Sequence, residues 1–497
     1  MAYDLIAAVD LGSNSFRLQV GRVVGNQIYP LDGLKEPVRL ASGLTPGKNL
    51  DSPSQLRGLG ALARFGELLR GYDAGAVRAV ATNTLRVAKN APAFLVEAEA
   101  ALGFPIEVIA GREEARLIYL GVAHTLPNPQ TQQLVVDIGG GSTEFIIGRN
   151  LQPRLLESLY MGCVSFTLRY FPDGRIGKKG MKEAELAARK ELQAIVQAYH
   201  GAGWEEAVGS SGTAKAIVDL IEMNGLNPGG AVGITRTGLE RLRDLLVEAG
   251  DVARLKLEGL RPDRVPVLPG GIAIMAAVFR EFGLECMTFS EGALRLGVLY
   301  DLLGRYHHED LREASVEEFM QRYEVDHLQA ARVGRTAARL LAEMQPATAA
   351  AGHADAQFLA WAARLHEIGI SVAHSSYHKH SAYILGNADM PGFSKRDQQR
   401  LARLVLAHRG KLERVQAVTT DAADWMLIFA LRIAVLLHRS RDDAAAAPVG
   451  AGITPRGFQL TVADDWLESS PLTAAAFADE ANQWAALGSD LRLRRRR

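Results

Sequence analysis

The sequence predicts an α/β protein made of two duplicated α/β halves, a mostly helical domain and a small C-terminal α+β unit. Three observations predict this order: an internal repeat, a second pair of similar segments, and a loss of strand signals after about residue 305. The 497 residues allow about three domains of about 100–200 residues each. We therefore assign residues 1–125 and 126–305 to the halves, 306–445 to the helical domain and 446–497 to the last unit.

The internal repeat aligns residues 9–15, Val-Asp-Leu-Gly-Ser-Asn-Ser, with residues 136–142, Val-Asp-Ile-Gly-Gly-Gly-Ser. Each copy is an apolar run that ends in Asp, then a Gly/Ser turn, then a second β-like run. A further pair, residues 79–82 and 207–210, follows at nearly the same offset, and each member precedes a helical stretch. Because two matches recur in the same order, we interpret residues 1–305 as a duplication.

The remainder of the chain has helical periodicity, most clearly in residues 316–344, 356–367 and 421–439. After an Ala/Pro/Gly-rich stretch, residues 458–462 are expected to form a strand, which a helix follows. The final arginines, 494–497, are expected to be a solvated, frayed tail.

The amino-acid composition excludes few classes of binding partner. Lys+Arg and Asp+Glu both number 56, so that a polyanionic substrate would need a local basic track. Cys163 and Cys286 lack CxxC spacing, which fits a reducing compartment. The N-terminus lacks a signal-peptide pattern, and the apolar run 427–437 is too short to span a membrane. We expect a cytoplasmic protein with no membrane span and no nucleic-acid partner.

The two Gly/Ser turns carry the first candidate chemistry. Their backbone N–H groups can surround phosphate oxygens, and Ser15, Ser142 and Thr143 add hydroxyl donors. Asp10 and Asp137 end the preceding strands, where a carboxylate can hold Mg²⁺ or a water. Two plain hairpin turns are the alternative. The matched acids in both copies favour one phosphate site between the halves.

Two further segments have the features of anion-binding helix starts. Thr82 follows a β-like run, and Arg86 is placed to form a bidentate clamp on phosphate. Alone, these two residues would be a helix cap and a surface charge. The corresponding stretch of the second half contributes Gly209, Ser211, Gly212 and Thr213.

Carboxylates also open the helix that is expected after residue 110. Glu113 and Glu114 in its first turn would ordinarily be caps and partners of the helix dipole. Beside a phosphate site, one of them can instead orient an attacking water. Glu144, just after the second turn, is a further candidate.

Residues 9–16, 82–86, 111–121, 137–144, 161–166 and 209–213 resemble, in the same order, segments of the exopolyphosphatase and guanosine pentaphosphate phosphohydrolase family. The resemblance covers nearly the whole chain. It implies two ribonuclease-H-like halves of the actin and sugar-kinase type around a cleft. It also implies Mg²⁺-dependent hydrolysis of a terminal phosphate.

The resemblance further implies a role for each matching residue. Glu114 would be the general base, and Asp137 and Glu144 would hold Mg²⁺ and the water. Ser142 would contact the cleaved phosphate, and Arg86 would neutralise one. The backbone amides around that phosphate would come from Gly139, Gly140 and Gly141, and the opposing loop from Asp10, Ser13, Asn14 and Ser15. The sequence departs from the family pattern at Asn83.

The substrate expectation comes from a histidine-rich stretch. Residues 365–369 and 374–383 resemble the exopolyphosphatase branch, so that inorganic polyphosphate is the expected substrate and guanosine pentaphosphate the alternative. A nucleotide-binding scaffold without turnover is a third possibility. His366-Glu367 resembles the His-Asp pair of HD phosphohydrolases, but Glu in place of Asp disfavours a two-metal site. A metal cluster is an alternative for His366, His374, His378, His380 and His408, since imidazole is a common ligand. We instead expect an HD-like domain that guides substrate or forms a homodimer.

Overall fold

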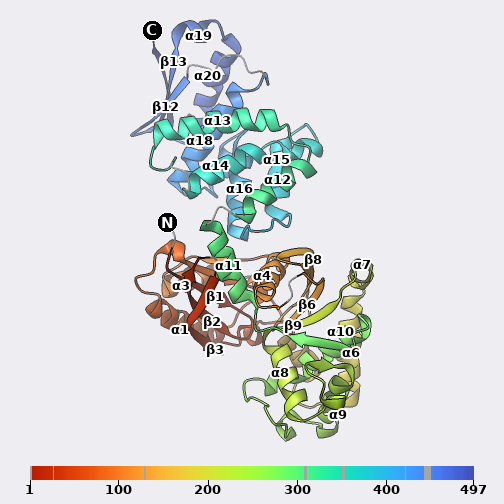
Figure 1. Ribbon diagram of the computed structural model, residues 1–497. Helices are drawn as coiled ribbons and strands as arrows, with labels where there is room; N and C mark the ends of the chain where they lie inside the picture. The colour runs from red at the N-terminus through yellow and green to blue at the C-terminus, as the bar shows by residue number, and fades with distance from the viewer. Residues whose placement is uncertain are drawn as a thin grey trace. The chain divides into compact units, whose positions relative to one another are not determined.

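The computed structural model describes residues 3–25, 27–127, 130–306, 310–349, 353–419, 421–441 and 449–496. The chain divides into two compact units, Met1–Asp310 and Leu311–Arg497 (Figure 1). The α/β prediction is confirmed at this level, because mixed sheets and helices make up the first unit and helices predominate in the second. The domain boundaries expected inside these units, near residues 125 and 445, stay predictions.

The first sheet of the first unit has the strand order β3-β2-β1-β4-β5. The pairs β1/β2 and β2/β3 are antiparallel, whereas β1/β4 and β4/β5 are parallel. Its strands are β1 Leu5–Leu11, β2 Phe16–Val24, β3 Gln27–Glu36, β4 Val77–Ala81 and β5 Ile106–Val108.

The second sheet has the order β10-β11-β9-β6-β7-β8. Apart from β10, its order and pair directions repeat those of the first sheet, with β6 and β7 in the places of β1 and β2. The repeated sequence segments therefore occupy equivalent positions in the two sheets. The strands are β6 Gln133–Ile138, β7 Thr143–Arg149, β8 Gln152–Leu159, β9 Glu206–Ser210, β10 Ile234–Thr235 and β11 Cys286–Phe289.

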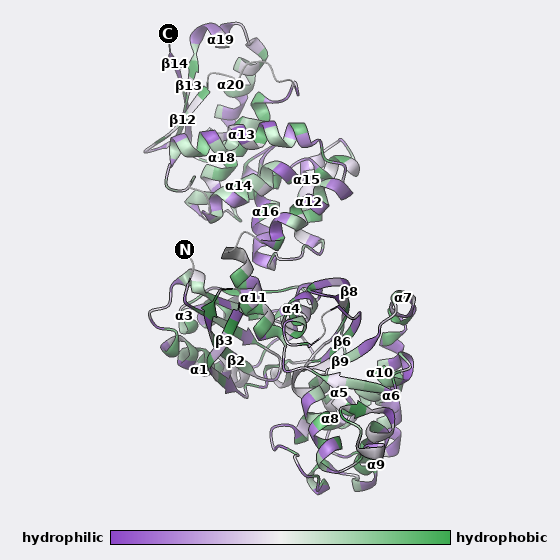
Figure 2. Cartoon of the chain, in the orientation of Figure 1, coloured by the Kyte–Doolittle hydropathy of each residue, from purple (hydrophilic) through white to green (hydrophobic). Residues whose placement is uncertain are grey.

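Helices α4, Gly111–Ala123, and α11, Leu294–Tyr306, share a hydrophobic core with both sheets. In this core Leu117 and Leu299 lie with Val80 of the first sheet and Val135 of the second. Figure 2 shows hydrophobic residues, in green, on the central strands of this unit, which are buried. The other helices are α1 Ser52–Leu68, α2 Asn83–Val87, α3 Ala91–Leu102, α5 Cys163–Tyr170, α6 Lys178–Leu192, α7 Val196–Ala202, α8 Ser211–Met223, α9 Arg236–Ala249 and α10 Leu268–Glu281.

The second unit has one hydrophobic core, to which its helices and a three-stranded sheet contribute. The helices are α12 Leu311–Arg322, α13 His327–Met344, α14 Ala354–Leu365, α15 Tyr377–Asn387, α16 Lys395–Ala407, α17 Glu413–Gln416, α18 Ala422–Leu437, α19 Asp464–Glu468 and α20 Pro471–Ala486. The strands are β12 Val449–Thr454, β13 Gly457–Ala463 and β14 Asp490–Arg496. None of the helices in the described residues is long and apolar enough to span a membrane.

The structure differs from two local expectations. The helical pattern of residues 316–344 is interrupted, because Glu324 has φ 50° and the Asp326 side chain caps α13 by accepting from the Gln329 amide at 3.0 Å. Of the expected frayed tail, residues 494–496 instead belong to strand β14, which pairs in parallel with β13 as far as Arg496 opposite Ala463, and residue 497 lies outside the described residues. Backbone pairing with β13 fixes this segment although its arginines are exposed.

Candidate active site

The two Gly/Ser loops meet in the first unit. The loop after β1 lies against the loop after β6 so closely that a Cβ on Gly140 would be 3.0 Å from Cβ of Ser13. A Cβ on Gly141 would be 2.5 Å from Oδ1 of Asn83, at the start of α2. Thr84 in the same helix donates a hydrogen bond to Oγ of Ser13 at 2.8 Å. The matched loops are thus neighbours, and glycine is required where they approach.

A cavity of about 340 Å³ opens beside these loops. We call it the cleft; its walls come from the ends of β1 and β6, from α4, and from the first turns of α8 and α11. The predicted site residues that line it are Asp10, Ser13, Asn14, Ser15, Thr82, Glu114, Asp137, Gly139, Gly140, Ser142, Glu144, Ser211, Gly212 and Thr213.

Four predicted residues lie behind the lining. The Arg86 guanidinium contacts Glu114 and donates to the Ile109 carbonyl at 2.9 Å. The Thr143 hydroxyl donates to the Met161 carbonyl at 2.6 Å. Gly209 lies at the end of β9, and Gly141 packs against Asn83. These residues shape the loops from behind.

Glu114 lies in the first turn of α4 with only 7% of its surface exposed. One Nη of Arg86 is 3.1 Å from its Oε2. Burial raises the pKa of Glu114 to about 7, Arg86 opposes this rise, and the nearby Asp10 and Asp137 add to it. A carboxyl group that titrates near neutral pH is suited to accept a proton from water.

The other carboxyl groups of the cleft are also buried. Burial is the main cause that raises the pKa of Asp137 to about 6 and the pKa of Asp10 above its ordinary value. Glu144 lies directly opposite Asp137 on β7, and its pKa is well above the ordinary range because of burial and of the charges on Glu114 and Asp137. A cation or bound water would stabilise this concentration of acids.

These residues fit a magnesium ion that is shared with a substrate. No hydrogen-bond donor of the described residues reaches the buried Oδ1 of Asp10, which leaves an oxygen for a ligand. No three His, Cys, Asp or Glu side chains in the described part of the chain are grouped closely enough to hold a metal by themselves. Mg²⁺ commonly takes one or two carboxylates, several waters and phosphate oxygens, which agrees with this arrangement.

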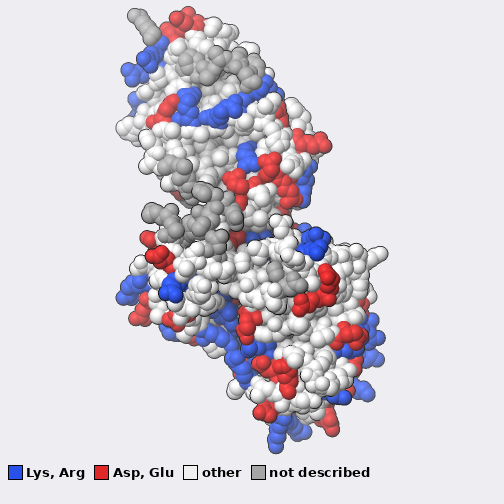
Figure 3. Space-filling view, viewed as in Figure 1, with Lys and Arg blue, Asp and Glu red and all other residues white. Residues whose placement is uncertain are grey.

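Basic side chains that sequence reasoning did not select line another part of the cleft. They include Arg17, Lys35, Lys215, Arg261, Arg264 and Arg295. Figure 3 shows Lys and Arg side chains gathered on this unit between β3 and α8. Burial, together with Arg295, lowers the pKa of Arg17 to about 10, so that it stays protonated at neutral pH. The cleft therefore provides the local basic track that net charge could not reveal.

The position of Arg17 could have been recognised from the internal repeat. Arg17 lies opposite Asp10 across β1 and β2, in the place that Glu144 occupies opposite Asp137 across β6 and β7. The equivalent positions thus carry a basic residue in one half and an acidic residue in the other. Lys35, Arg264 and Arg295 are far from any motif in the sequence, and only the fold brings them to the cleft.

The first turn of α8 is tied to the loop after β6. Thr213 and Ser211 donate side-chain hydrogen bonds to the Ile138 carbonyl at 2.8 and 3.3 Å. Ser211 has φ 70°, which costs a non-glycine residue about 1–3 kcal/mol. The Arg264 guanidinium packs against the Cα of Gly212, where a Cβ would overlap it. A helix N-terminus with an arginine beside it is an anion site.

The histidine-rich stretch packs inside the second unit. His366, His378 and His408 are buried, with the rings of His366 and His408 5.2 Å apart, whereas His374 is exposed and His380 is half-buried. Burial is the main cause that lowers the pKa of each of the three buried imidazoles. Among the described residues this cluster does not form a metal-binding group.

The model of the Ppx/GppA phosphatase family matches residues 19–306, and the model of Ppx/GppA phosphatase domain III matches residues 311–481. The chain belongs to the Ppx/GppA phosphatase family. It is 37% identical over 494 residues to a guanosine-5'-triphosphate,3'-diphosphate pyrophosphatase of Aeromonas hydrophila, which covers 98% of both chains. It is 36% identical over 488 residues to the protein of the same name from Pseudoalteromonas translucida, which covers 98% of this chain and 97% of that relative.

Solved structures agree with this family fold. The Aquifex aeolicus family member is 26% identical, with a TM-score of 0.51 over 61% of this chain and 99% of that one. An exopolyphosphatase from Cytophaga hutchinsonii has a TM-score of 0.55 at 24% identity, over 60% of this chain and 97% of that one, and supports the fold alone. This Ppx/GppA chain has the actin-like fold of the family.

The expected exopolyphosphatase activity is wrong. The full-length relatives at 36–37% identity are both guanosine-5'-triphosphate,3'-diphosphate pyrophosphatases. The expectation was based on histidines, and His366, His378 and His408 are packed in the interior of the second unit. They do not belong to the described lining of the cleft, so they are poor indicators of its substrate.

Proposed function

We propose that this Ppx/GppA phosphatase hydrolyses guanosine pentaphosphate to guanosine tetraphosphate and orthophosphate. The observation that carries the proposal is the 36–37% identity, along nearly the whole chain, to two guanosine-5'-triphosphate,3'-diphosphate pyrophosphatases. The cleft supports it with a basic region for a highly charged nucleotide and a group of acids for the reaction.

The proposed reaction needs one proton acceptor and several groups that bind phosphate. Glu114 takes a proton from water, whose oxygen then bonds to the terminal phosphorus. The bond from that phosphorus to the bridging oxygen breaks, and the bridging oxygen stays on the tetraphosphate. The loop of Gly139 and Gly140, with Ser142, surrounds the terminal phosphate, and the loop of Ser13 faces it from the other side.

Mg²⁺ bound beside Asp137 or Glu144 would neutralise phosphate charge and favour attack by the water. Arg86 has a different task, because it contacts Glu114 rather than the cavity. It stabilises the carboxylate form of Glu114 and so keeps part of the base unprotonated at neutral pH. Arg17 and Arg264 hold the remaining phosphates of the nucleotide.

The test is release of orthophosphate from guanosine pentaphosphate with Mg²⁺, with the tetraphosphate product identified by chromatography. We expect kcat/KM for guanosine pentaphosphate to exceed that for GTP and for inorganic polyphosphate. Glu114→Gln should lower kcat by about 10²–10⁴-fold and leave product binding intact. Tight nucleotide binding without any release by the wild-type chain would indicate a scaffold and contradict the proposal.

We also propose an evolutionary origin for the first unit, a fold type for the helical domain and an oligomeric state. The common strand order supports an origin of the first unit from two duplicated ribonuclease-H-like halves. The helices around His366 would then be an HD-like domain without catalytic metals, and the chain would form a homodimer. Sedimentation equilibrium measures the oligomeric state, and a monomer at micromolar concentration would contradict the last point.

A further inference from the structure

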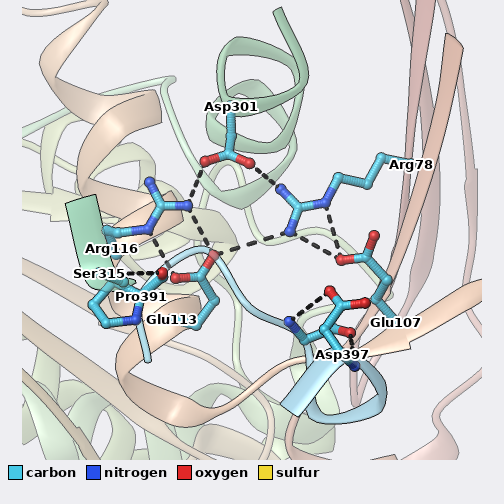
Figure 4. A network of polar contacts seen from close by, with 9 residues as sticks. Arg78, Glu107, Glu113, Arg116, Asp301, Ser315, Pro391 and Asp397 are labelled. Carbon is cyan, nitrogen blue, oxygen red and sulfur yellow. Dashed lines mark hydrogen bonds and ion pairs between the residues drawn. The ribbon is translucent and has the colours of Figure 1, made fainter. Parts of the chain in front are cut away.

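A buried ionic network joins β4, α4 and α11 in the first unit (Figure 4). Asp301 of α11 contacts Arg78 of β4 through Oδ2 at 2.5 Å and Arg116 of α4 through Oδ1 at 2.5 Å. Arg116 also donates two hydrogen bonds to Glu113, both at 2.8 Å. Arg78 completes the network by donating to Glu107 of β5 at 3.0 and 3.1 Å. One carboxylate thus joins two arginines from different elements.

This network holds the back of the turn that carries the proposed base. Glu113 and Arg116 are three residues apart and lie on one side of α4, where Asp301 is placed. Glu114 is the next residue along and points instead to the cleft and to Arg86. A change in the position of the network would therefore rotate or shift Glu114.

The same two helices also pack through glycines. A Cβ on Gly121 of α4 would overlap the Ala293 carbonyl, and a Cβ on Gly297 of α11 would overlap the Leu117 carbonyl. Such backbone contact leaves little freedom for one helix to slide on the other. Arg295 of α11 lines the cleft. The close contact between α4 and α11 therefore fixes the position of Arg295 relative to Glu114.

Strand β4 positions Arg86, the third group of the site after Glu114 and Arg295. Its end leads directly into Thr82 and then into α2, which carries Arg86. Arg78 is the second residue of this strand and 97% buried. Its contact with Asp301 therefore links the strand that positions Arg86 to the helices that position Glu114 and Arg295.

We propose that Asp301 is a positioning residue that sets the distance between Glu114 and Arg86. This proposal rests on the proposed function, because it assigns the network to the reaction of the same cleft. Asp301 itself lies outside the cleft lining and touches no substrate. Its ion pairs with Arg78 of β4 and Arg116 of α4 hold this strand and this helix together.

The decisive variant is Asp301→Asn, which keeps the shape of the side chain and removes its charge. We expect kcat for guanosine pentaphosphate to fall about tenfold or more, with KM within about twofold of wild type. The pKa of Glu114 should rise by about half a unit or more, because Arg86 then opposes protonation less. Selective labelling of glutamate allows carbonyl-carbon NMR to follow this pKa without substrate, with Glu114→Gln identifying the signal.

Two further variants separate positioning from a general loss of folding. Arg78→Lys keeps the buried charge but cannot contact Glu107 and Asp301 together, and should show a smaller change of the same kind. Glu281→Gln removes a 2.5 Å ion pair with Arg189 that does not involve α4, and should leave kcat and the Glu114 pKa unchanged.

An unchanged Glu114 pKa in Asp301→Asn would overturn the proposal, whether or not kcat falls. A fall in kcat that only follows the folded fraction, measured by circular dichroism, would overturn it as well. Absence of guanosine pentaphosphate turnover in the wild-type chain would instead contradict the proposed function. The NMR titration would still decide whether Asp301 positions Glu114.

Discussion

Glu114 accepts a hydrogen bond from the Arg86 guanidinium at 3.1 Å in the wall of the cleft. The same nitrogen of the guanidinium, Nη1, also donates to the Ile109 carbonyl, just before α4 begins. Burial favours the neutral form of Glu114, whereas Arg86 favours the carboxylate. The pair therefore places the titration of the proposed base close to neutral pH.

The first prediction concerns the pH dependence of turnover. In the proposed reaction Glu114 acts as a carboxylate, so kcat/KM should fall about tenfold per pH unit below a midpoint near its pKa of about 7. Arg86→Gln should move this midpoint upward, because the charge that favours the carboxylate is lost. Arg86→Lys, which keeps the charge, is the control. An acid limb at the same pH in Arg86→Gln would contradict the assigned role of Arg86.

The second prediction concerns stability. The pKa of Glu144 is raised in the folded chain, so between pH 4.5 and that raised value the folded state binds more protons than the unfolded state. Its ionisation therefore destabilises the fold as pH rises. Glu144→Gln should raise Tm at pH 8 by about 2 °C or more, and should change it little at pH 4. Calorimetry at both pH values checks this, and an equal shift at both would argue against a charge effect.

The third prediction concerns the contact of Gly162 with the loop after β6. A Cβ on Gly162 would overlap the backbone of Gly140 and Gly141, which surrounds the proposed phosphate site. Gly162→Ala should therefore lower kcat/KM by about 10²-fold, since displacement of a binding loop by about 1 Å has this effect. Gly201→Ala is the matched control, because no atom lies within 4 Å of the added Cβ. Equal activity of the two variants would show that the loops tolerate the shift.

The fourth prediction concerns the metal. Chelation with EDTA should abolish turnover, and added Mg²⁺ should restore it. Asp137→Asn should raise the Mg²⁺ concentration for half-maximal activity by about tenfold or more, because a carboxylate ligand is lost. Asp173→Asn, at an exposed position, should leave that concentration unchanged. Full turnover in EDTA would remove the metal from the reaction.

The sequence predicts the loops well and their partners poorly, for physical reasons. Asp10 and Asp137 are recognisable because strand, acid and turn are adjacent in the chain, and this local pattern occurs twice. Lys35, Arg264 and Arg295 reach the cleft only through β3, the segment before α10, and α11, so no local pattern marks them. Their long-range approach depends on sheet order, which a single sequence does not specify.

Local sequence patterns also failed to predict the substrate and the helix boundaries. The histidines suggested a substrate by resemblance, but His366 and His408 contact each other in a core rather than the cleft. The continuous pattern across residues 316–344 is broken by the backbone of Glu324 and the cap at Asp326, which periodicity does not detect. In each case packing or backbone conformation decides the outcome.

Arg17 and Glu144 occupy equivalent strand positions, one basic and one acidic, so the cleft is not symmetric. In the proposed reaction a chain of phosphates along the cleft meets Arg17 beside the loop after β1 and Glu144 beside the loop after β6. Its two ends are therefore not interchangeable, although the folds around them are alike. The pseudo-symmetric frame supplies two similar loops, and the unlike residues at these equivalent positions make the surroundings of the two loops different.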